Sequence, residues 1–150
     1  MLLTGVTGDS LWLRISGYQF PDAGDPRKRY SWHMVSGEAR CAEGSWDFEW
    51  QALRCDETPR LSAWLRAAAS NEGLTPLTFV EPNLGFRLAG DAPVGHALEV
   101  DLDLEFLPPW NRHGEAGDPT TLRIATGSEG LRAAADAWDE ERAPFPDLTR

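Results

Sequence analysis

Cysteine is scarce in this sequence: Cys41 and Cys55 are the only two among 150 residues. Two cysteines are too few for a disulfide framework, and their spacing fits no metal-binding motif. The chain also lacks a hydrophobic run long enough for a transmembrane helix, and its first residues lack the basic and apolar regions of a secretory signal. We therefore expect a cytoplasmic protein with two reduced thiols, no membrane partner and no metal ion.

Positive charge is also in short supply. The chain has 14 lysines and arginines against 24 aspartates and glutamates, which gives a formal net charge of −10. Such a protein is poorly suited to bind nucleic acid or an anionic membrane, because both are negatively charged. A basic protein partner suits it better. With 41% apolar and 10% aromatic residues, the chain is expected to fold as one globular domain over residues 1–150.

The motifs of common enzymes and cofactor sites are missing as well. There is no nucleophile elbow, no phosphate-binding loop and no dinucleotide-binding glycine motif, and the three histidines are scattered. A hydrolase could use Glu81, in the stretch VEPNLGF, as a general acid together with a strand carboxylate. The dipeptide Pro82-Asn83 favours instead a turn in which Glu81 or Asn83 bonds the local backbone. We predict no catalytic residue and no cofactor, and the hydrolase is the least favoured alternative.

Apolar residues recur with a period of two in several stretches, which is typical of half-buried β-strands. These stretches are residues 10–20, 30–41, 46–55, 77–90, 98–106 and 120–127. The second and third are close enough in sequence to form a β-hairpin. In the third, Asp47 and Glu49 lie on the face opposite Trp46 and Trp50.

Two other stretches have the spacing of an amphipathic helix. Within residues 58–73, Thr58 is a candidate N-cap and Pro59 the first helical residue. The apolar stripe of this helix consists of Leu61, Trp64, Leu65 and Ala68, and that of the second helix of Leu131, Ala134, Ala135 and Trp138. Together the elements predict an α+β fold, with a mainly antiparallel β-sheet of about six to eight strands and two amphipathic helices packed on it.

The stretch HALEVDLDLEFLPPW carries four carboxylates at alternate positions. They belong to Glu99, Asp101, Asp103 and Glu105. The pattern predicts an extended strand over residues 98–106 with its apolar side in the core and a row of carboxylates on the other side. Carboxylates spaced by roughly 6.6–7 Å along a strand cannot converge on one metal ion. As a solvated face, the row costs at most about 2 kcal/mol in repulsion. As a binding face, it attracts a basic partner.

Tryptophan is frequent, with seven residues in the chain. Trp46 and Trp50 share a strand face, and core packing explains them best because the helices need an apolar sheet face to cover. If both were exposed and coplanar, they would form a stacking platform for sugars. A carbohydrate- or small-ligand-binding module is therefore the main alternative function.

Six motifs in chain order resemble those of the WapI family of bacterial immunity proteins. They are ISGYQFPD (15–22), GSWDFEW (44–50), LSAWLRAAA (61–69), FVEPNLGF (79–86), LDLEFLPPW (102–110) and FPD (145–147). The resemblance implies a small cytoplasmic protein that neutralises the toxic tip of a contact-dependent toxin, in the namesake system a tRNA nuclease. It carries over no catalytic residue and does not identify the toxin.

The resemblance and the net charge support the same hypothesis. A nuclease has a basic active face because it must hold a nucleic-acid backbone, and an acidic inhibitor can occupy that face. We therefore predict that a basic toxin domain is the partner and that the carboxylate row contributes to the binding surface. The predicted contact residues are Glu99, Asp101, Asp103, Glu105 and Trp110.

Overall fold

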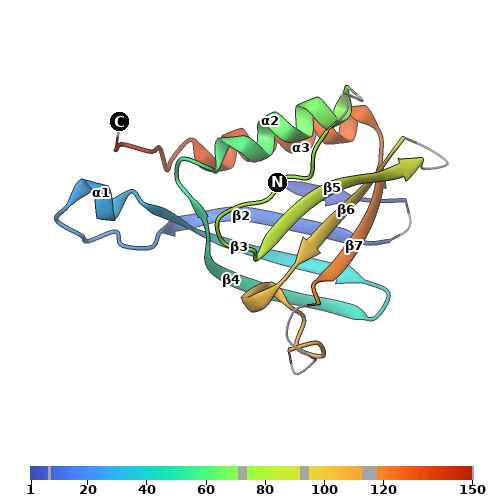
Figure 1. Ribbon diagram of the computed structural model, residues 1–150, viewed down its shortest axis with the longest axis horizontal. Helices are drawn as coiled ribbons and strands as arrows, with labels where there is room; N and C mark the ends of the chain where they lie inside the picture. The colour runs from blue at the N-terminus through green and yellow to red at the C-terminus, as the bar shows by residue number, and fades with distance from the viewer. Residues whose placement is uncertain (7, 71–73, 92–94, 113–117, 150) are drawn as a thin grey trace.

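The computed structural model describes residues 1–6, 8–70, 74–91, 95–112 and 118–149 (Figure 1). Within these residues, seven β-strands form two antiparallel sheets. The first sheet contains β1 (Leu2–Thr4), β2 (Ser10–Tyr18), β3 (Trp32–Cys41) and β4 (Gly44–Arg54), in that order. The second contains β5 (Leu84–Asp91), β6 (His96–Leu102) and β7 (Thr120–Thr126). The helices are α1 (Pro26–Arg29), α2 (Pro59–Ala69) and α3 (Ser128–Arg142), and a short 3-10 helix, η1, covers Leu104–Phe106.

The predicted α+β fold is confirmed, although the strands form two sheets. The sheets meet where β1 runs beside β7, and the Val6 amide there donates to the Ala125 carbonyl at 3.2 Å. Apolar side chains of both sheets and of α2 and α3 form one buried core. Among the described residues, no helix is long and apolar enough to cross a membrane.

The two long helices lie side by side along one side of the molecule (Figure 1). Ser62 of α2 donates to Asp139 of α3 at 2.7 Å, and Arg66 forms an ion pair with the same carboxylate at 2.8 Å. Burial alone would raise the pKa of Asp139, but the hydrogen bonds from Ser62, Arg142 and Arg66 prevail and lower it to about 2. The contact between the helices is therefore polar at its solvent side and apolar beneath.

The predicted start of α2 at Pro59 is confirmed, but Thr58 does not cap it with its side chain. The Thr58 hydroxyl instead donates to the Arg54 carbonyl at 3.0 Å. Gly73, the last residue of the predicted stretch 58–73, lies outside the described residues, and α2 ends at Ala69. In the second helix, the whole predicted stripe is buried, and α3 ends at Arg142, before Pro144.

The predicted hairpin of β3 and β4 is also confirmed, with a two-residue turn between Cys41 and Gly44. Gly37 in β3 allows the Phe48 ring of β4 to approach closely. A Cβ atom on Gly37 would lie 2.6 Å from that ring and 2.5 Å from the Trp12 carbonyl oxygen. Any side chain at Gly37 would therefore collide with the backbone of β2 and displace the Phe48 ring.

The predicted strand over residues 98–106 is wrong in its second half. Strand β6 ends at Leu102, and the Asp103 side chain accepts a hydrogen bond from the Leu104 amide at 2.7 Å, which starts η1. This local side-chain bond competes with continued strand pairing. Pro108 and Pro109 follow soon after and would lack the amides that a longer strand needs.

Candidate functional site

Two of the predicted contact residues, Glu99 and Asp101, are paired within the chain. Glu99 is only 7% exposed and bonds Arg87 at 2.6 Å and Arg123 at 2.8 Å. Asp101 bonds Arg87 and accepts a hydrogen bond from Thr121 at 2.6 Å. The hydrogen bond to Asp101 raises the pKa of the Arg87 guanidinium. The expected uncovered row of four carboxylates is therefore wrong.

The strand register explains this pairing. Arg87 of β5, Glu99 of β6 and Arg123 of β7 lie directly opposite one another. Opposite charges at such positions stabilise neighbouring strands. The carboxylates of β6 thus join three strands, and their charge is compensated before any partner arrives.

Of the two other predicted carboxylates, Asp103 caps the start of η1 and Glu105 lies within it, and a buried asparagine fixes both residues by hydrogen bonds. The fully buried Asn83 donates from Nδ2 to the Glu105 carboxylate at 2.7 Å and to the Asp103 carbonyl at 3.5 Å. Its own backbone carbonyl accepts from the Asp103 amide at 3.0 Å. The Asn83 Oδ1 atom has no hydrogen-bond partner among the described residues. The predicted turn at Pro82-Asn83 is confirmed, but the Asn83 side chain does not bond the local backbone. It bonds Asp103 and Glu105, which are distant in sequence, and so positions η1.

A hollow of about 560 Å³ lies between η1 and the edge strand β4. Leu104 and Trp50 at its border are 47% and 38% exposed, respectively. We name the η1–β4 surface for the residues that line this hollow, which include Asp47, Glu49, Trp50, Leu104, Glu105 and Arg112. Three of these side chains are acidic and one is basic, so a cationic partner is favoured there.

Trp110 packs at the Gly44 end of the same strand. Its ring meets the Trp46 ring edge to face at 5.4 Å and remains partly exposed. Trp46 itself is 5% exposed and donates from Nε1 to the Phe106 carbonyl at 2.9 Å. Trp46 therefore belongs to the core, and it forms no exposed platform with Trp50.

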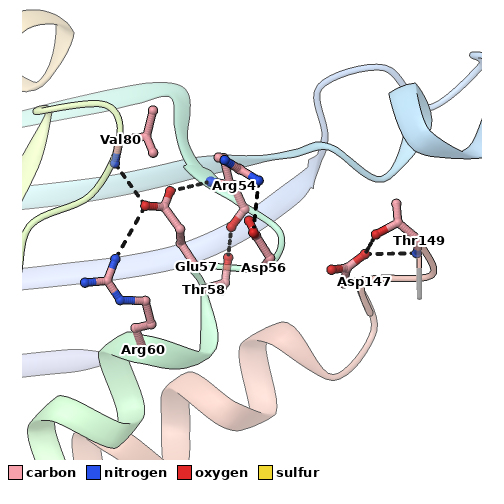
Figure 2. A network of polar contacts seen from close by, with 8 residues as sticks. All are labelled: Arg54, Asp56, Glu57, Thr58, Arg60, Val80, Asp147 and Thr149. Atoms are coloured by element: carbon pink, nitrogen blue, oxygen red, sulfur yellow. Dashed lines mark hydrogen bonds and ion pairs between the residues drawn. The ribbon is translucent and has the colours of Figure 1, made fainter.

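A second hollow, of about 550 Å³, has two polar pairs in its lining, Arg54 with Asp56 and Asp147 with Thr149. Figure 2 shows the network beside it, in which the buried Glu57 carboxylate accepts from the Val80 amide at 3.0 Å and the Arg54 amide at 3.3 Å. Arg60 approaches the same carboxylate at 3.5 Å, and Arg54 forms an ion pair with Asp56 at 3.0 Å. These contacts fix the turn between β4 and α2, so their role is structural.

A third hollow borders His33 and Cys55. Burial raises the pKa of the Cys55 thiol to about 12, so this thiol is protonated and a poor nucleophile. Burial lowers the pKa of His33, whose ring lies 2.7 Å from the Thr58 hydroxyl and 2.9 Å from the Phe145 carbonyl. The contact of His33 with the Phe145 carbonyl helps to hold the chain after α3 in place. Glu81 lines none of the four hollows described for this structure.

Most of the η1–β4 surface was not predicted from the sequence as a site. Asp47 and Glu49 alternate with aromatic residues along β4, which is the same pattern as in the stretch chosen from the sequence. The second acidic alternation was therefore a usable signal. The exposure of Leu104 could not be predicted from the sequence, because an apolar residue that alternates with carboxylates is expected to be buried.

The fold places this chain among α+β proteins with two antiparallel sheets. The chain belongs to the WapI-like immunity protein family, whose family model matches residues 1–146. The predicted family is thus confirmed, and its name supports an immunity function with a toxin as the partner. No curated protein and no solved structure matches the chain significantly.

Proposed function

We propose that this chain is an immunity protein that binds a basic toxin domain through the η1–β4 surface and thereby covers the toxin's active face. Of the five contact residues predicted from the sequence, only Glu105 lines this surface. Asp103 precedes Leu104 in the chain, and Trp110 packs against Trp46 and Gly44. Glu99 and Asp101 are left out because their charges are compensated by Arg87 and Arg123. The residues added are Asp47, Glu49, Trp50 and Leu104.

The observation that carries this proposal is the backbone conformation and the exposure of Leu104. Leu104 is the only non-glycine residue with positive φ in the described part of the chain, at 50°, and its side chain is 47% exposed. A left-handed backbone costs an ordinary residue about 1–2 kcal/mol, and an exposed leucine gains little from folding. Strain of this kind concentrates at functional positions. A partner that covers Leu104 would gain an apolar anchor beside acidic groups.

Charge supports a nuclease as the class of toxin. The net charge of −10 and the carboxylates beside Leu104 complement a face that binds a nucleic-acid backbone. Such a toxin acts in the cytoplasm, so the immunity protein would act there too. Both cysteines are free, which suits a reducing compartment.

The test is protection against the toxin domain encoded next to the gene of this chain. Cells that co-express this domain with the double variant Asp47→Lys, Glu105→Lys should lose protection, and the dissociation constant of the purified complex should rise at least about tenfold. The association rate of the unaltered chain should fall as salt is added.

The matched control makes the same change in net charge by replacing two glutamates of α3, away from the η1–β4 surface. Glu129 and Glu140 of α3 are exposed, so the double variant Glu129→Lys, Glu140→Lys should protect cells like the unaltered chain. Equal protection and equal affinity for both double variants would refute the η1–β4 surface as the binding site. Failure of the unaltered chain to bind this toxin domain would refute the proposed function itself.

A further inference from the structure

The direction of backbone groups in β4 follows from one hydrogen bond elsewhere in the sheet. The Leu13 amide of β2 donates to the Met1 carbonyl at 2.9 Å, so it points away from β3. Leu13 lies opposite Gly37 of β3. In an antiparallel ladder, opposite residues alternate between pairs that exchange hydrogen bonds and pairs that do not. Leu13 and Gly37 are a pair of the second kind, and the Gly37 backbone is left to bond β4.

The same alternation between β3 and β4 shows which backbone amide and carbonyl groups of β4 point away from β3. Gly37 lies opposite Phe48, so these two exchange hydrogen bonds. The flanking residues Asp47 and Glu49 therefore direct their amide and carbonyl groups away from β3. Strand β4 is the last strand of its sheet, and none of the described residues forms a recorded hydrogen bond with these outward groups.

The free edge faces the hollow of the η1–β4 surface. Asp47, Glu49 and Trp50 line this hollow on the β4 side, and Leu104 and Glu105 line it on the η1 side. A strand added to β4 would lie about 4.8 Å from it, in the direction of the hollow. Its side chains would alternate between the face of Asp47 and Glu49 and the face of Trp50 and Leu104.

We propose that the toxin adds one extended segment to the free edge of β4, with backbone hydrogen bonds to Asp47 and Glu49. The segment alternates basic residues, which face the Asp47 carboxylate, with apolar residues, which face Trp50 and Leu104. The Glu49 carboxylate already accepts hydrogen bonds from Ser36 and Ser16, so Glu49 contributes its backbone groups. This inference rests on the proposed function and specifies how the partner binds. A second copy of this chain is a poor occupant, because the carboxylates of two β4 edges would repel each other.

Proline at position 47 tests the backbone bond. Asp47→Pro removes the outward amide, and an edge strand tolerates proline where the amide faces solvent. Asp47→Asn is the matched control, because it removes the same charge and keeps the amide. The toxin domain encoded by the adjacent gene is the probe. Asp47→Pro should bind it at least about tenfold more weakly than Asp47→Asn does, whereas equal binding by the two folded variants would overturn strand addition.

Amide hydrogen exchange gives a second measurement on the unaltered chain, independent of the folding of any variant. The Asp47 and Glu49 amides should exchange fast in the free protein and at least about tenfold more slowly in the complex, while the Phe48 amide should be protected in both. A complex in which the Asp47 and Glu49 amides still exchange fast would overturn strand addition and leave the immunity function intact. Their protection in the chain alone at high concentration would identify a second copy as the occupant and would also overturn the proposal.

Discussion

Leu104 and Asn83 together determine the shape of η1. Leu104 has a left-handed backbone, and the buried amide of Asn83 holds the residues on both sides of it. Asn83 cannot turn its amide over, because the carboxylate and carbonyl that it contacts both need a donor. The strain at Leu104 therefore persists because its neighbours are fixed from below.

Glycine at position 104 should separate the role of Leu104 in binding from its cost in folding. Leu104→Gly relieves the left-handed strain, offset by about 0.5–1 kcal/mol of added chain entropy. Its free energy of unfolding in urea should stay equal or rise by up to about 1 kcal/mol, and toxin binding should weaken. Leu104→Ala keeps the strain and loses the side chain. A Leu104→Gly protein less stable than Leu104→Ala would contradict this account.

At the level of elements, the ion pairs of β6 hold the second sheet together. Glu99 is buried between an arginine of β5 and an arginine of β7. A buried carboxylate is tolerated only when cations and hydrogen bonds compensate it. The two arginines thus compensate the buried charge of Glu99, and the resulting ion pairs link β5, β6 and β7.

Reversing the charge of Glu99 should damage the fold and not merely the binding. Glu99→Lys places a third cation between Arg87 and Arg123, and the free energy of unfolding should fall by about 3–5 kcal/mol in urea denaturation. The control is Glu38→Lys, at an exposed position of β3 opposite Asp47. It should change the stability by less than about 0.5 kcal/mol or increase it. Equal losses for both variants would show that Glu99 is not specially supported.

The same strand shows what the sequence could and could not predict. Alternating residues predicted β6 correctly, because one buried face imposes a period of two. The period continues through Asp103 and Glu105, so the pattern alone could not locate the end at Leu102. That end depends on Asp103 bonding its neighbour and on Asn83, which comes from an earlier turn of the chain.

The arginine partners of Glu99 could not be predicted from the sequence either. Arg87 and Arg123 come to lie opposite Glu99 only through the strand register, which no local pattern specifies. By contrast, the apolar stripes of α2 and α3 and the hairpin of β3 and β4 depend on local spacing, and all were predicted. Local periodicity was thus recoverable from the sequence, and pairing across strands was not.

For the whole molecule, the chain after α3 closes the structure onto the first sheet. Tyr18 of β2 donates to the Pro146 carbonyl at 2.7 Å, and its ring meets the Phe145 ring at 5.7 Å. His33 of β3 contacts the Phe145 carbonyl from the other side. The motifs GYQFP and FPD of the family resemblance therefore meet in space, and their shared role is to hold the C-terminal residues.

The stability of the whole protein should depend on His33 below neutral pH. Its pKa in the folded state is lower than the ordinary 6.5, so the unfolded chain binds a proton that the folded chain does not. Stability is therefore greatest above pH 6.5 and falls as the pH decreases below it, by at most about 1.4 kcal/mol per pH unit for one proton. Urea denaturation between pH 5 and 8 measures this slope, and His33→Gln should flatten it.

Asp139 provides a control with a different pH window. Its pKa in the folded state is about 2, below the ordinary 3.8, so its contribution is present above pH 3.8 and is lost as the pH falls toward 2. Asp139→Asn should therefore lower stability at neutral pH without changing the slope between pH 5 and 8. An unchanged slope in His33→Gln would contradict the assignment to His33.

The helices α2 and α3 and the strand edge at β4 and η1 lie on opposite sides of the molecule (Figure 1). A fluorophore or a surface tether attached at the exposed Glu140 of α3 would therefore leave the edge accessible, which makes single-molecule detection of toxin capture practical. On the proposed mode of binding, a changing toxin would exert its selection only on the β4 side, and the outer helix surface would be free to diverge during evolution.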